Sequence, residues 1–344
     1  MPDPLVSIVI PCFNAAAYVA DAIRSGLEQT YSHREVIVID DGSTDGSLEV
    51  LKSFGSAIRW ETGPNRGACA ARNRGWRMAQ GELIQFLDAD DWLYPNKLEL
   101  QVAALTASPD ATPVCDWDTF DEAQVLRHFT CPATCEDSFI PLLNAQLPTP
   151  SPLHRKSAIE RVGGFREGLP CAQEFDLHLR LACQGWKLQR IAEPLYAVRR
   201  LPGSVSSSYE KVLDQLLSVA QRARDILQSR NAWTDPRARA LAGFLTRHAR
   251  HYAKVGCHDK AARYFAAACE FHPSGGWDIA YGRLTRLAAG CLGPVRLERL
   301  LASVRNAGLP RPSSTAPATP PPAASPQSAP DRRESRVPSD TPAR

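Results

Sequence analysis

Three short apolar runs near the start of the chain constrain its fold most strongly. They cover residues 6–10, 36–39 and 83–87, and each has the length of a single strand. Strands that are buried on both faces have continuous apolar runs, and such strands are typical of parallel sheets covered by helices. The runs therefore favour a parallel β-sheet whose two faces are both hidden from solvent.

Helical patterns occupy the segments that separate these runs. Val19, Ala22 and Ile23 have the spacing of one buried helix face, and residues 47–54 and 68–79 have the pattern of two further helices. Pro95 is expected in the first turn of a fourth helix. This alternation predicts an α/β fold with a doubly wound, mostly parallel sheet flanked by helices.

The pattern changes farther along the chain. Val114 and Cys115 indicate another strand, and helices are expected over residues 157–165 and 174–184. After Ser208 the pattern is helical and contains one tetratricopeptide-like hairpin. We expect three parts, namely an α/β domain over residues 1–208, a helical region over 209–309 and a disordered Pro/Ser/Ala-rich tail over 310–344.

Composition limits the classes of partner. A formal net charge of +3 is too small to indicate a nucleic acid, so none is expected. The amino terminus shows no secretory signal pattern, and no apolar stretch approaches the roughly 20 residues that span a bilayer. We therefore expect a cytoplasmic protein whose ten cysteines are reduced and mostly packed.

Two acidic segments directly follow apolar runs. The first is Asp40-Asp41-Gly42-Ser43-Thr44-Asp45, and carboxylates at the end of a parallel strand face the crevice where open α/β sheets bind ligands. They can accept hydrogen bonds from a nucleobase or a ribose. The alternative is a strand–helix turn in which Ser43 or Thr44 caps the helix.

The second acidic segment is Asp88-Ala89-Asp90-Asp91. If it continues a strand, Asp88 and Asp90 point to the same side and Asp91 points away. Mg²⁺ and Mn²⁺ prefer oxygen ligands, commonly one or two carboxylates together with substrate phosphates. The segment therefore predicts a divalent-cation site, with a solvated acidic turn as the alternative.

Two common phosphate-binding motifs are absent from the first strand–helix junction. Residues 11–17 contain no glycine, which excludes a G-x-G-x-x-G turn and a P-loop at this position. The same absence disfavours a nucleotidyltransferase, which would need a glycine-rich basic loop here. If phosphates bind, a cation and arginine side chains must contact them.

Together these segments resemble the family 2 glycosyltransferases of the GT-A fold, over roughly residues 5–208. Five motifs occur in the order and at the spacing of that family. They are Ser7-Ile8-Val9-Ile10-Pro11-Cys12-Phe13-Asn14, Ser25-Gly26-Leu27-Glu28-Gln29-Thr30-Tyr31, residues 35–45, Asn65-Arg66-Gly67 with Ala71-Arg72-Asn73, and residues 81–91.

The resemblance implies roles for named side chains on the donor side. It implies an inverting transfer of a sugar from a nucleoside-diphosphate-sugar to an acceptor hydroxyl, in surface-glycan or glycolipid assembly, with Mn²⁺ or Mg²⁺ as cofactor. Asp88 and Asp90 would hold the metal. The implied donor-binding residues are Pro11, Phe13, Asn14, Asp41, Arg72 and Asp88.

On the acceptor side, the resemblance implies a general base at the start of a helix. That position falls on Glu174, where relatives more often have Asp, and Asp176 on the same turn is the second candidate. Alternatively, both carboxylates only complement a helix N-terminus. Arg199, Arg200 and Ser204 resemble a segment that closes over the diphosphate, although Leu201 stands where many relatives have His. A solvated basic loop is the alternative there.

Three questions stay open at this stage. Trp117 and Asp118 either line a sugar pocket or pack in the interior. The last helices carry arginines beside leucines, which suits packing on their own domain or peripheral contact with the inner face of a membrane. Finally, a catalytically silent GT-A-like binding module is the alternative to an enzyme.

Overall fold

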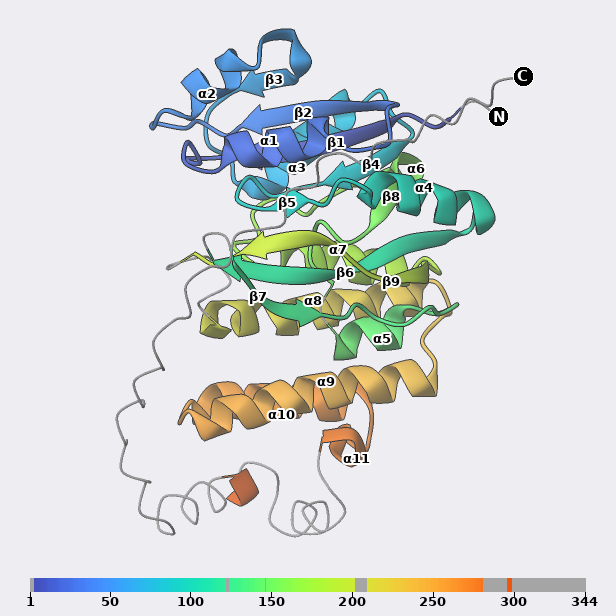
Figure 1. Cartoon of the computed structure of the whole chain (residues 1–344). Coiled ribbons are helices and arrows are strands. Elements are labelled where there is room, and N and C mark those ends of the chain that lie inside the picture. Colours follow the sequence, from blue (N-terminus) through green and yellow to red (C-terminus); the bar gives the residue numbers. More distant parts are fainter. Residues whose placement is uncertain (1–2, 122–123, 146, 202–208, 281–295, 299–344) are drawn as a thin grey trace, which may run out of the picture. The chain divides into compact units, whose positions relative to one another are not determined.

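The computed structural model describes residues 3–121, 124–145, 147–201, 209–280 and 296–298 (Figure 1). Residues 1–300 form one compact unit and residues 301–344 a second. The fold described below is that of the first unit. It consists of two β-sheets, helices that cover them, and a set of long helices that follows.

The predicted parallel sheet is confirmed. Its strand order is β3-β2-β1-β4-β8. The strands are β1 (Val6–Cys12), β2 (Arg34–Asp40), β3 (Arg59–Thr62), β4 (Leu83–Phe86) and β8 (Leu153–Arg155). All neighbours pair in parallel except β8, which is antiparallel to β4. Because β1 and β2 lie side by side in parallel, their carboxyl ends, with Cys12 opposite Asp40, meet at one edge of the sheet.

Short helices flank this sheet where the sequence predicted them. They are α1 (Val19–Leu27), α2 (Ser47–Ser53), α3 (Ala68–Met78) and α4 (Lys97–Ala107). Close contact of α3 with the sheet depends on Gly75, because a β-carbon there would overlap the Val9 side chain. One boundary was wrong: α4 begins at Lys97 after Asn96, so Pro95 precedes the helix instead of lying in its first turn.

A second sheet of four strands was not predicted. Its order is β5-β9-β6-β7, with β5 (Trp92–Leu93), β6 (Ala111–Asp121), β7 (Gln124–Phe129) and β9 (Lys187–Arg199). Val114 and Cys115 do lie in a strand, β6, as expected. The pairing of β6 with β9 shifts register on either side of Asp116, and Pro194 lies within β9. These irregularities break the periodicity by which a strand is recognised in sequence.

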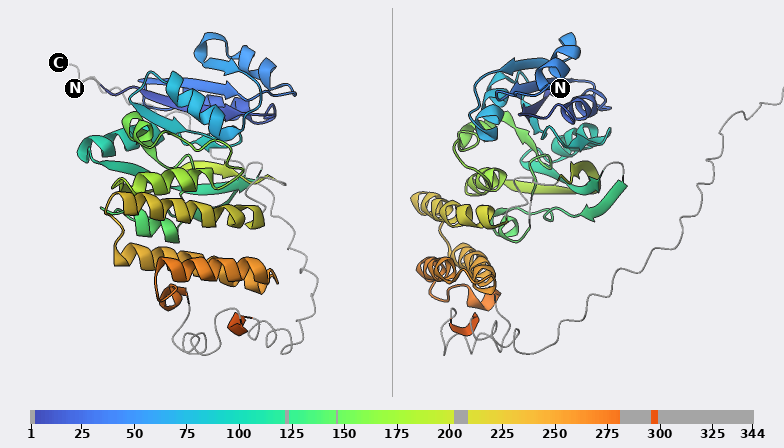
Figure 2. Two further views of the ribbon diagram at one scale, coloured as in Figure 1. Left: turned by 180° about the vertical axis from the view of Figure 1, so that it is seen from behind. Right: turned by 90° about the vertical axis from the view of Figure 1, so that its left-hand side faces the viewer.

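Long helices follow the sheets, as predicted from the sequence. They are α8 (Tyr209–Ser229), α9 (Asp235–Lys254) and α10 (His258–Phe271), and the short helix α11 (Trp277–Ala280) comes after them. Helices α9 and α10 lie side by side as a hairpin, and Tyr252 and Phe265 are buried (Figure 2). Helix α9 also packs on α5 (Phe139–Asn144) and α8. Within the described ranges, no helix is long and apolar enough to cross a bilayer.

One charged side chain lies in the interior beside the sheet. Lys97 is fully buried, and its Nζ donates hydrogen bonds to Oε1 of Gln85, at 2.7 Å, and to Oε1 of Gln101. Both acceptors are neutral amides. Burial therefore lowers the pKa of the Lys97 ammonium to about 8.

The lowered pKa of Lys97 predicts an unusual dependence of stability on pH. Between about pH 8 and 10.5 the unfolded chain holds a proton on this lysine that the folded chain has lost. The free energy of unfolding should therefore rise with pH in this window, by up to about 3 kcal/mol relative to Lys97→Met. Urea denaturation of both proteins from pH 7 to 10.5 measures the difference. Parallel pH curves would contradict the assignment.

Candidate active site

The first acidic segment forms the turn that follows β2. Asp40 accepts hydrogen bonds from the backbone N–H groups of Gly42 and Ser43 and from the hydroxyl of Thr62. Asp41 accepts from the backbone N–H groups of Arg66, at 2.9 Å, and Gly67, at 2.7 Å. The two adjacent negative charges are thus offset by the chain itself, and Asp41 anchors the residues that precede α3.

Three of the predicted donor-binding residues lie at the end of β1 and on the loop that follows it. Phe13 is half exposed, with 50% of its surface accessible, so its ring face is free to stack on a ligand. Asn14 has a left-handed backbone (φ +49°), and its side-chain oxygen accepts from the Thr44 N–H at 2.8 Å. Pro11 lies within β1. The loop is therefore held against the turn that contains Asp41.

Arg72 connects three separate segments of the chain. From the middle of α3 its guanidinium contacts Oδ1 of Asp88 at 2.6 Å and Oε1 of Gln173 at 2.7 Å. The guanidinium carbon also lies 5.2 Å from the centre of the Phe165 ring. Helix α3 thus links Asp41 at its start to Asp88 and to α7 (Gln173–Ala182).

The second acidic segment forms a turn and does not continue the strand that precedes it. Strand β4 ends at Phe86, and the Asp91 N–H donates to the carbonyl oxygen of Asp88 at 3.1 Å. Asp91 is buried and accepts from the backbone N–H of Arg199 at 2.9 Å. Burial and the nearby Asp88 charge raise the pKa of Asp90. A group of negative charges is therefore held close together by the turn.

The two candidate general bases have different surroundings. Glu174 is half-buried, and burial raises the pKa of its carboxyl, with the Asp88 charge adding to the shift and Arg72 opposing it. Asp176 is only 1% exposed and forms ion pairs with Arg180 at 2.8 Å and Arg222 at 3.1 Å. An acceptor hydroxyl can therefore approach Glu174, whereas Asp176 is enclosed by protein.

The proposed closing segment is only partly described. The Arg199 guanidinium lies against the rings of Tyr18 and Phe120, and its Nε donates to the carbonyl oxygen of Asp90 at 3.1 Å. Arg200 is exposed, and its backbone N–H donates to Phe120. Ser204 lies outside the described residues. In this arrangement Arg199 supports the acidic turn and does not extend into solvent.

Two residues that the sequence did not single out organise the acceptor side. Asn73 donates to the Phe165 carbonyl and accepts from the Phe165 N–H, both at 2.8 Å. It fixes the segment that follows α6 (Lys156–Arg161), where Gly164 has no room for a β-carbon beside Asn73. Gln173 accepts from Arg72. Both residues lie in segments that resemble motifs of the family, but the sequence assigned a role to neither.

Trp117 and Asp118 lie in the packed interior of the second sheet. Trp117 is 6% exposed and stacks on Phe129 with ring centres 5.2 Å apart. Asp118 accepts from the Tyr94 hydroxyl at 2.9 Å and contacts Nδ1 of His128 at 3.1 Å. These contacts favour ordinary packing for Trp117 over a place in the sugar pocket.

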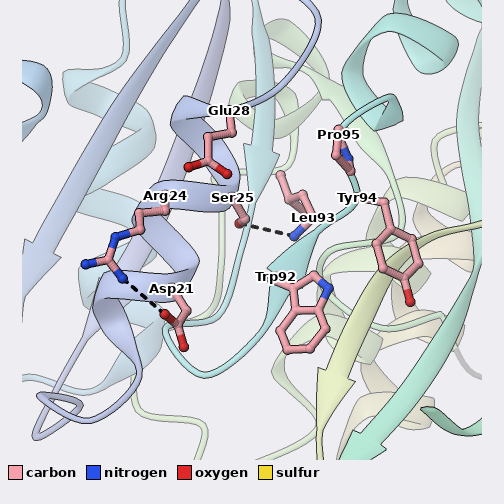
Figure 3. A pocket seen from close by; sticks show the side chains of 8 residues that line it. All are labelled: Asp21, Arg24, Ser25, Glu28, Trp92, Leu93, Tyr94 and Pro95. Atoms are coloured by element: carbon pink, nitrogen blue, oxygen red, sulfur yellow. Dashed lines mark hydrogen bonds and ion pairs between the residues drawn. The ribbon is translucent and has the colours of Figure 1, made fainter. Parts of the chain in front are cut away.

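Two surface hollows lie near the site. One of about 460 Å³ runs along α3 and is lined by Asp41, Arg66 and Glu167 among others. The other, of about 350 Å³, lies between α1 and β5, where Asp21, Trp92 and Tyr94 are among its walls (Figure 3). Neither hollow is lined by Asp88 or Asp90. Asp41 and the acidic turn are therefore connected through contacts with helix α3, and neither hollow is lined by both of them.

The acidic turn offers few ligands to a metal. Among the described residues, no group of three or more His, Cys, Asp or Glu side chains is placed to hold an ion. Asp88 and Asp90 supply two carboxylates that are close enough to repel each other. Two carboxylates fit Mg²⁺ or Mn²⁺, which commonly complete their coordination with substrate phosphates and water.

Part of the chain matches a known family. Residues 7–144 match the family described as glycosyl transferase family 2. An uncharacterized glycosyltransferase of Rickettsia typhi is 33% identical over 183 residues, which cover 51% of this chain and 58% of that protein. The E. coli UDP-Glc:alpha-D-GlcNAc-diphosphoundecaprenol beta-1,3-glucosyltransferase WfgD is 34% identical over 134 residues, which cover 38% of this chain and 53% of WfgD. Residues 7–144 are thus similar to glycosyl transferase family 2, and the chain spans about half the length of these relatives.

The fold is also shared with a solved structure. The crystal structure of S. aureus TarS 1–349 in complex with UDP-GlcNAc matches with a TM-score of 0.67 and 18% sequence identity. The match covers 88% of this chain and 91% of that one. The GT-A fold with a following helical region is therefore confirmed.

The surroundings of Glu174 and Asp176 predict that removing the charge of each residue changes the free energy of unfolding by a different amount. Asp176→Asn removes a carboxylate that is 1% exposed and pairs with the buried Arg180, and breaking a buried pair typically costs about 3–5 kcal/mol. Glu174→Gln should change the free energy of unfolding by less than about 1 kcal/mol, because Glu174 has no ion-pair partner within the described ranges. Urea denaturation measures both. Equal effects would show that the two carboxylates do not differ in this way.

Proposed function

We propose that the chain is an inverting glycosyltransferase that moves a sugar from a nucleoside-diphosphate-sugar to an acceptor hydroxyl. The observation that carries the proposal is the connection from Asp88 through Arg72 to Gln173, next to Glu174. It brings the acidic turn, which is the proposed cation site, close to a candidate base. The match of residues 7–144 to glycosyl transferase family 2 supports this interpretation.

The donor is proposed to be a UDP-sugar. Two similar proteins are associated with UDP compounds: WfgD is named as a transferase that uses UDP-Glc, and TarS was solved with UDP-GlcNAc. In this chain the exposed ring of Phe13 offers a stacking face for the base. Asp41 already accepts hydrogen bonds from the backbone N–H groups of Arg66 and Gly67. A hydrogen bond from the base would be a further one to the same carboxylate.

A divalent cation, Mn²⁺ or Mg²⁺, is proposed at Asp88 and Asp90. When bound, it would neutralise the charge that accumulates on the departing nucleoside diphosphate. The raised pKa of Asp90 reflects charge repulsion that a cation would relieve. Arg72, which pairs with Asp88, holds that carboxylate in a fixed position beside Asp90.

Glu174 is proposed as the general base, and Asp176 as a residue that positions α7. Glu174 would accept the proton of the acceptor hydroxyl while the oxygen attacks the anomeric carbon from the face opposite the leaving group. Its raised pKa makes it a stronger base than an ordinary glutamate. Arg200 and Ser204, together with Arg199, remain the proposed contacts to the diphosphate.

The acceptor is proposed to be a glycan or glycolipid of the cell surface. WfgD carries a diphosphoundecaprenol-linked acceptor in its name, and the similar Bacillus subtilis TuaG is named for putative teichuronic acid biosynthesis. TuaG is 39% identical over 105 residues, 29% of this chain and 41% of TuaG. Such an acceptor places the enzyme in the cytoplasm, at the inner face of the membrane.

Removing the Asp90 carboxylate tests the cation site. Asp90→Asn keeps the side-chain size but should abolish the tightening of UDP binding by Mn²⁺, because one of two carboxylate ligands is lost. Isothermal titration with UDP, with and without Mn²⁺, measures the effect, and Glu49→Gln in α2 changes an exposed carboxylate as the control. Unchanged Mn²⁺ dependence in Asp90→Asn would refute the assignment.

Removing the Glu174 charge tests the base. Glu174→Gln should leave UDP binding intact and lower kcat by roughly 10²–10⁴-fold, the usual contribution of a general base. The wild-type kcat/KM should rise with pH through a pKa above the ordinary glutamate value of 4.5, since the base works only when deprotonated. UDP release from a panel of UDP-sugars measures both. If no donor turns over with any acceptor, the catalytically silent module becomes the better interpretation.

A further inference from the structure

Asp176 is surrounded by three arginines that come from three different segments. Its carboxylate lies 2.8 Å from Nε of Arg180 and 3.1 Å from Nη2 of Arg222. Nε of Arg166 is 3.6 Å from the same carboxylate. Arg166 precedes α7, Arg180 is in α7 and Arg222 is in α8. One negative charge is therefore shared by three positive ones.

The excess positive charge has hydrogen-bond donors that the protein does not use. Nη2 of Arg180 is buried and has no hydrogen-bond partner, and the side chain as a whole is 10% exposed. Within the described ranges, Arg166 makes its one ion pair to Asp176 and no hydrogen bond. Glu167 follows Arg166 in the sequence, but its carboxylate is already paired with Arg66 at 3.2 Å. Buried donors without partners are costly, so this cluster favours a further anion.

The exposed arms of the cluster are accessible from solvent. The Arg166 side chain is 45% exposed and that of Arg222 is 27% exposed, whereas Arg180 forms the buried base. Asp176 orients these guanidinium groups, and guanidinium groups bind phosphate oxygens through paired N–H donors. Burial of part of the cluster keeps its field from being screened by water.

The cluster lies on the acceptor side of the candidate active site. Asp176 and Glu174 share the first turn of α7. Residues two apart on a helix point in different directions, so Glu174 lies by Arg72 and Asp88 while Asp176 faces α8. An anion at Arg166 and Arg222 would therefore be separate from the donor diphosphate, which is proposed at Asp88 and Asp90.

We infer that Arg166, Arg222 and Arg180 form a subsite for the phosphate or diphosphate group of the acceptor. The inference rests on the proposed function, because it needs an acceptor that is linked through such a group. It also gives the helical region a role, since α8 supplies one of the two exposed arginines. The helices after the α/β domain thus complete acceptor recognition.

Binding of geranyl diphosphate, a soluble prenyl diphosphate, tests the subsite directly. Isothermal titration is done on the full chain with saturating UDP and Mn²⁺, so that the donor site is filled. Wild type should bind geranyl diphosphate but not geraniol, and inorganic pyrophosphate should compete. Arg166→Gln and Arg222→Gln should each weaken binding about ten-fold, the effect of losing one charge-assisted hydrogen bond of about 1.4 kcal/mol.

Control variants separate the subsite from folding and from the donor site. Arg230→Gln alters an exposed arginine next to the end of α8 and should bind geranyl diphosphate as wild type does. Arg222→Lys keeps the charge and should lose less affinity than Arg222→Gln. The Tm and the UDP affinity of Arg166→Gln should equal those of wild type, because Arg166 is exposed and makes no hydrogen bond.

The possible results distinguish the two proposals. Geranyl diphosphate affinity that is unchanged in both Arg→Gln variants, or absent in wild type, overturns the subsite. If the protein binds geranyl diphosphate through these arginines but binds no UDP, the anion subsite stands and the glycosyltransferase proposal fails. If UDP binds and geranyl diphosphate does not, only the subsite is refuted.

Discussion

The ion pair between Arg72 and Asp88 is the contact on which the arrangement of the site depends. It joins the middle of α3 to the turn after β4, and the same guanidinium reaches Gln173 at the start of α7. The Phe165 ring lies under this guanidinium, and Asn73 fixes the Phe165 backbone. Since an Arg–carboxylate pair is directional, the distance from the acidic turn to Glu174 is set by one side chain.

Much of the α/β core and the location of the site could be predicted from the sequence. The runs at residues 6–10, 36–39 and 83–87 are buried on both faces, so composition alone indicates a strand there. Strand β9 could not be found this way. Pro194 lies within it, and its pairing with β6 shifts register on either side of Asp116. Whether the acidic segment continues the strand or turns was left open, because an apolar run does not show where its hydrogen bonding stops.

The roles of individual carboxylates depend on tertiary contacts that no local pattern contains. Glu174 and Asp176 differ by two positions on one helix turn, yet one is half-buried and the other is enclosed by arginines. Arg222 lies 46 residues after Asp176, so its contact is invisible in the motif. Likewise, Arg199 was assigned to the diphosphate from its segment, but the aromatic rings around it hold it against the acidic turn.

A crystal structure of the chain with UDP and Mn²⁺, with the ion located by anomalous scattering, would test the site most directly. The ion should lie within about 2.2 Å of a carboxylate oxygen of Asp90 or Asp88 and should contact the UDP phosphates. Glu174 should face the same space. The description would be contradicted if Mn²⁺ and UDP bound elsewhere, for example in the hollow between α1 and β5, while Asp88 and Asp90 contacted neither of them.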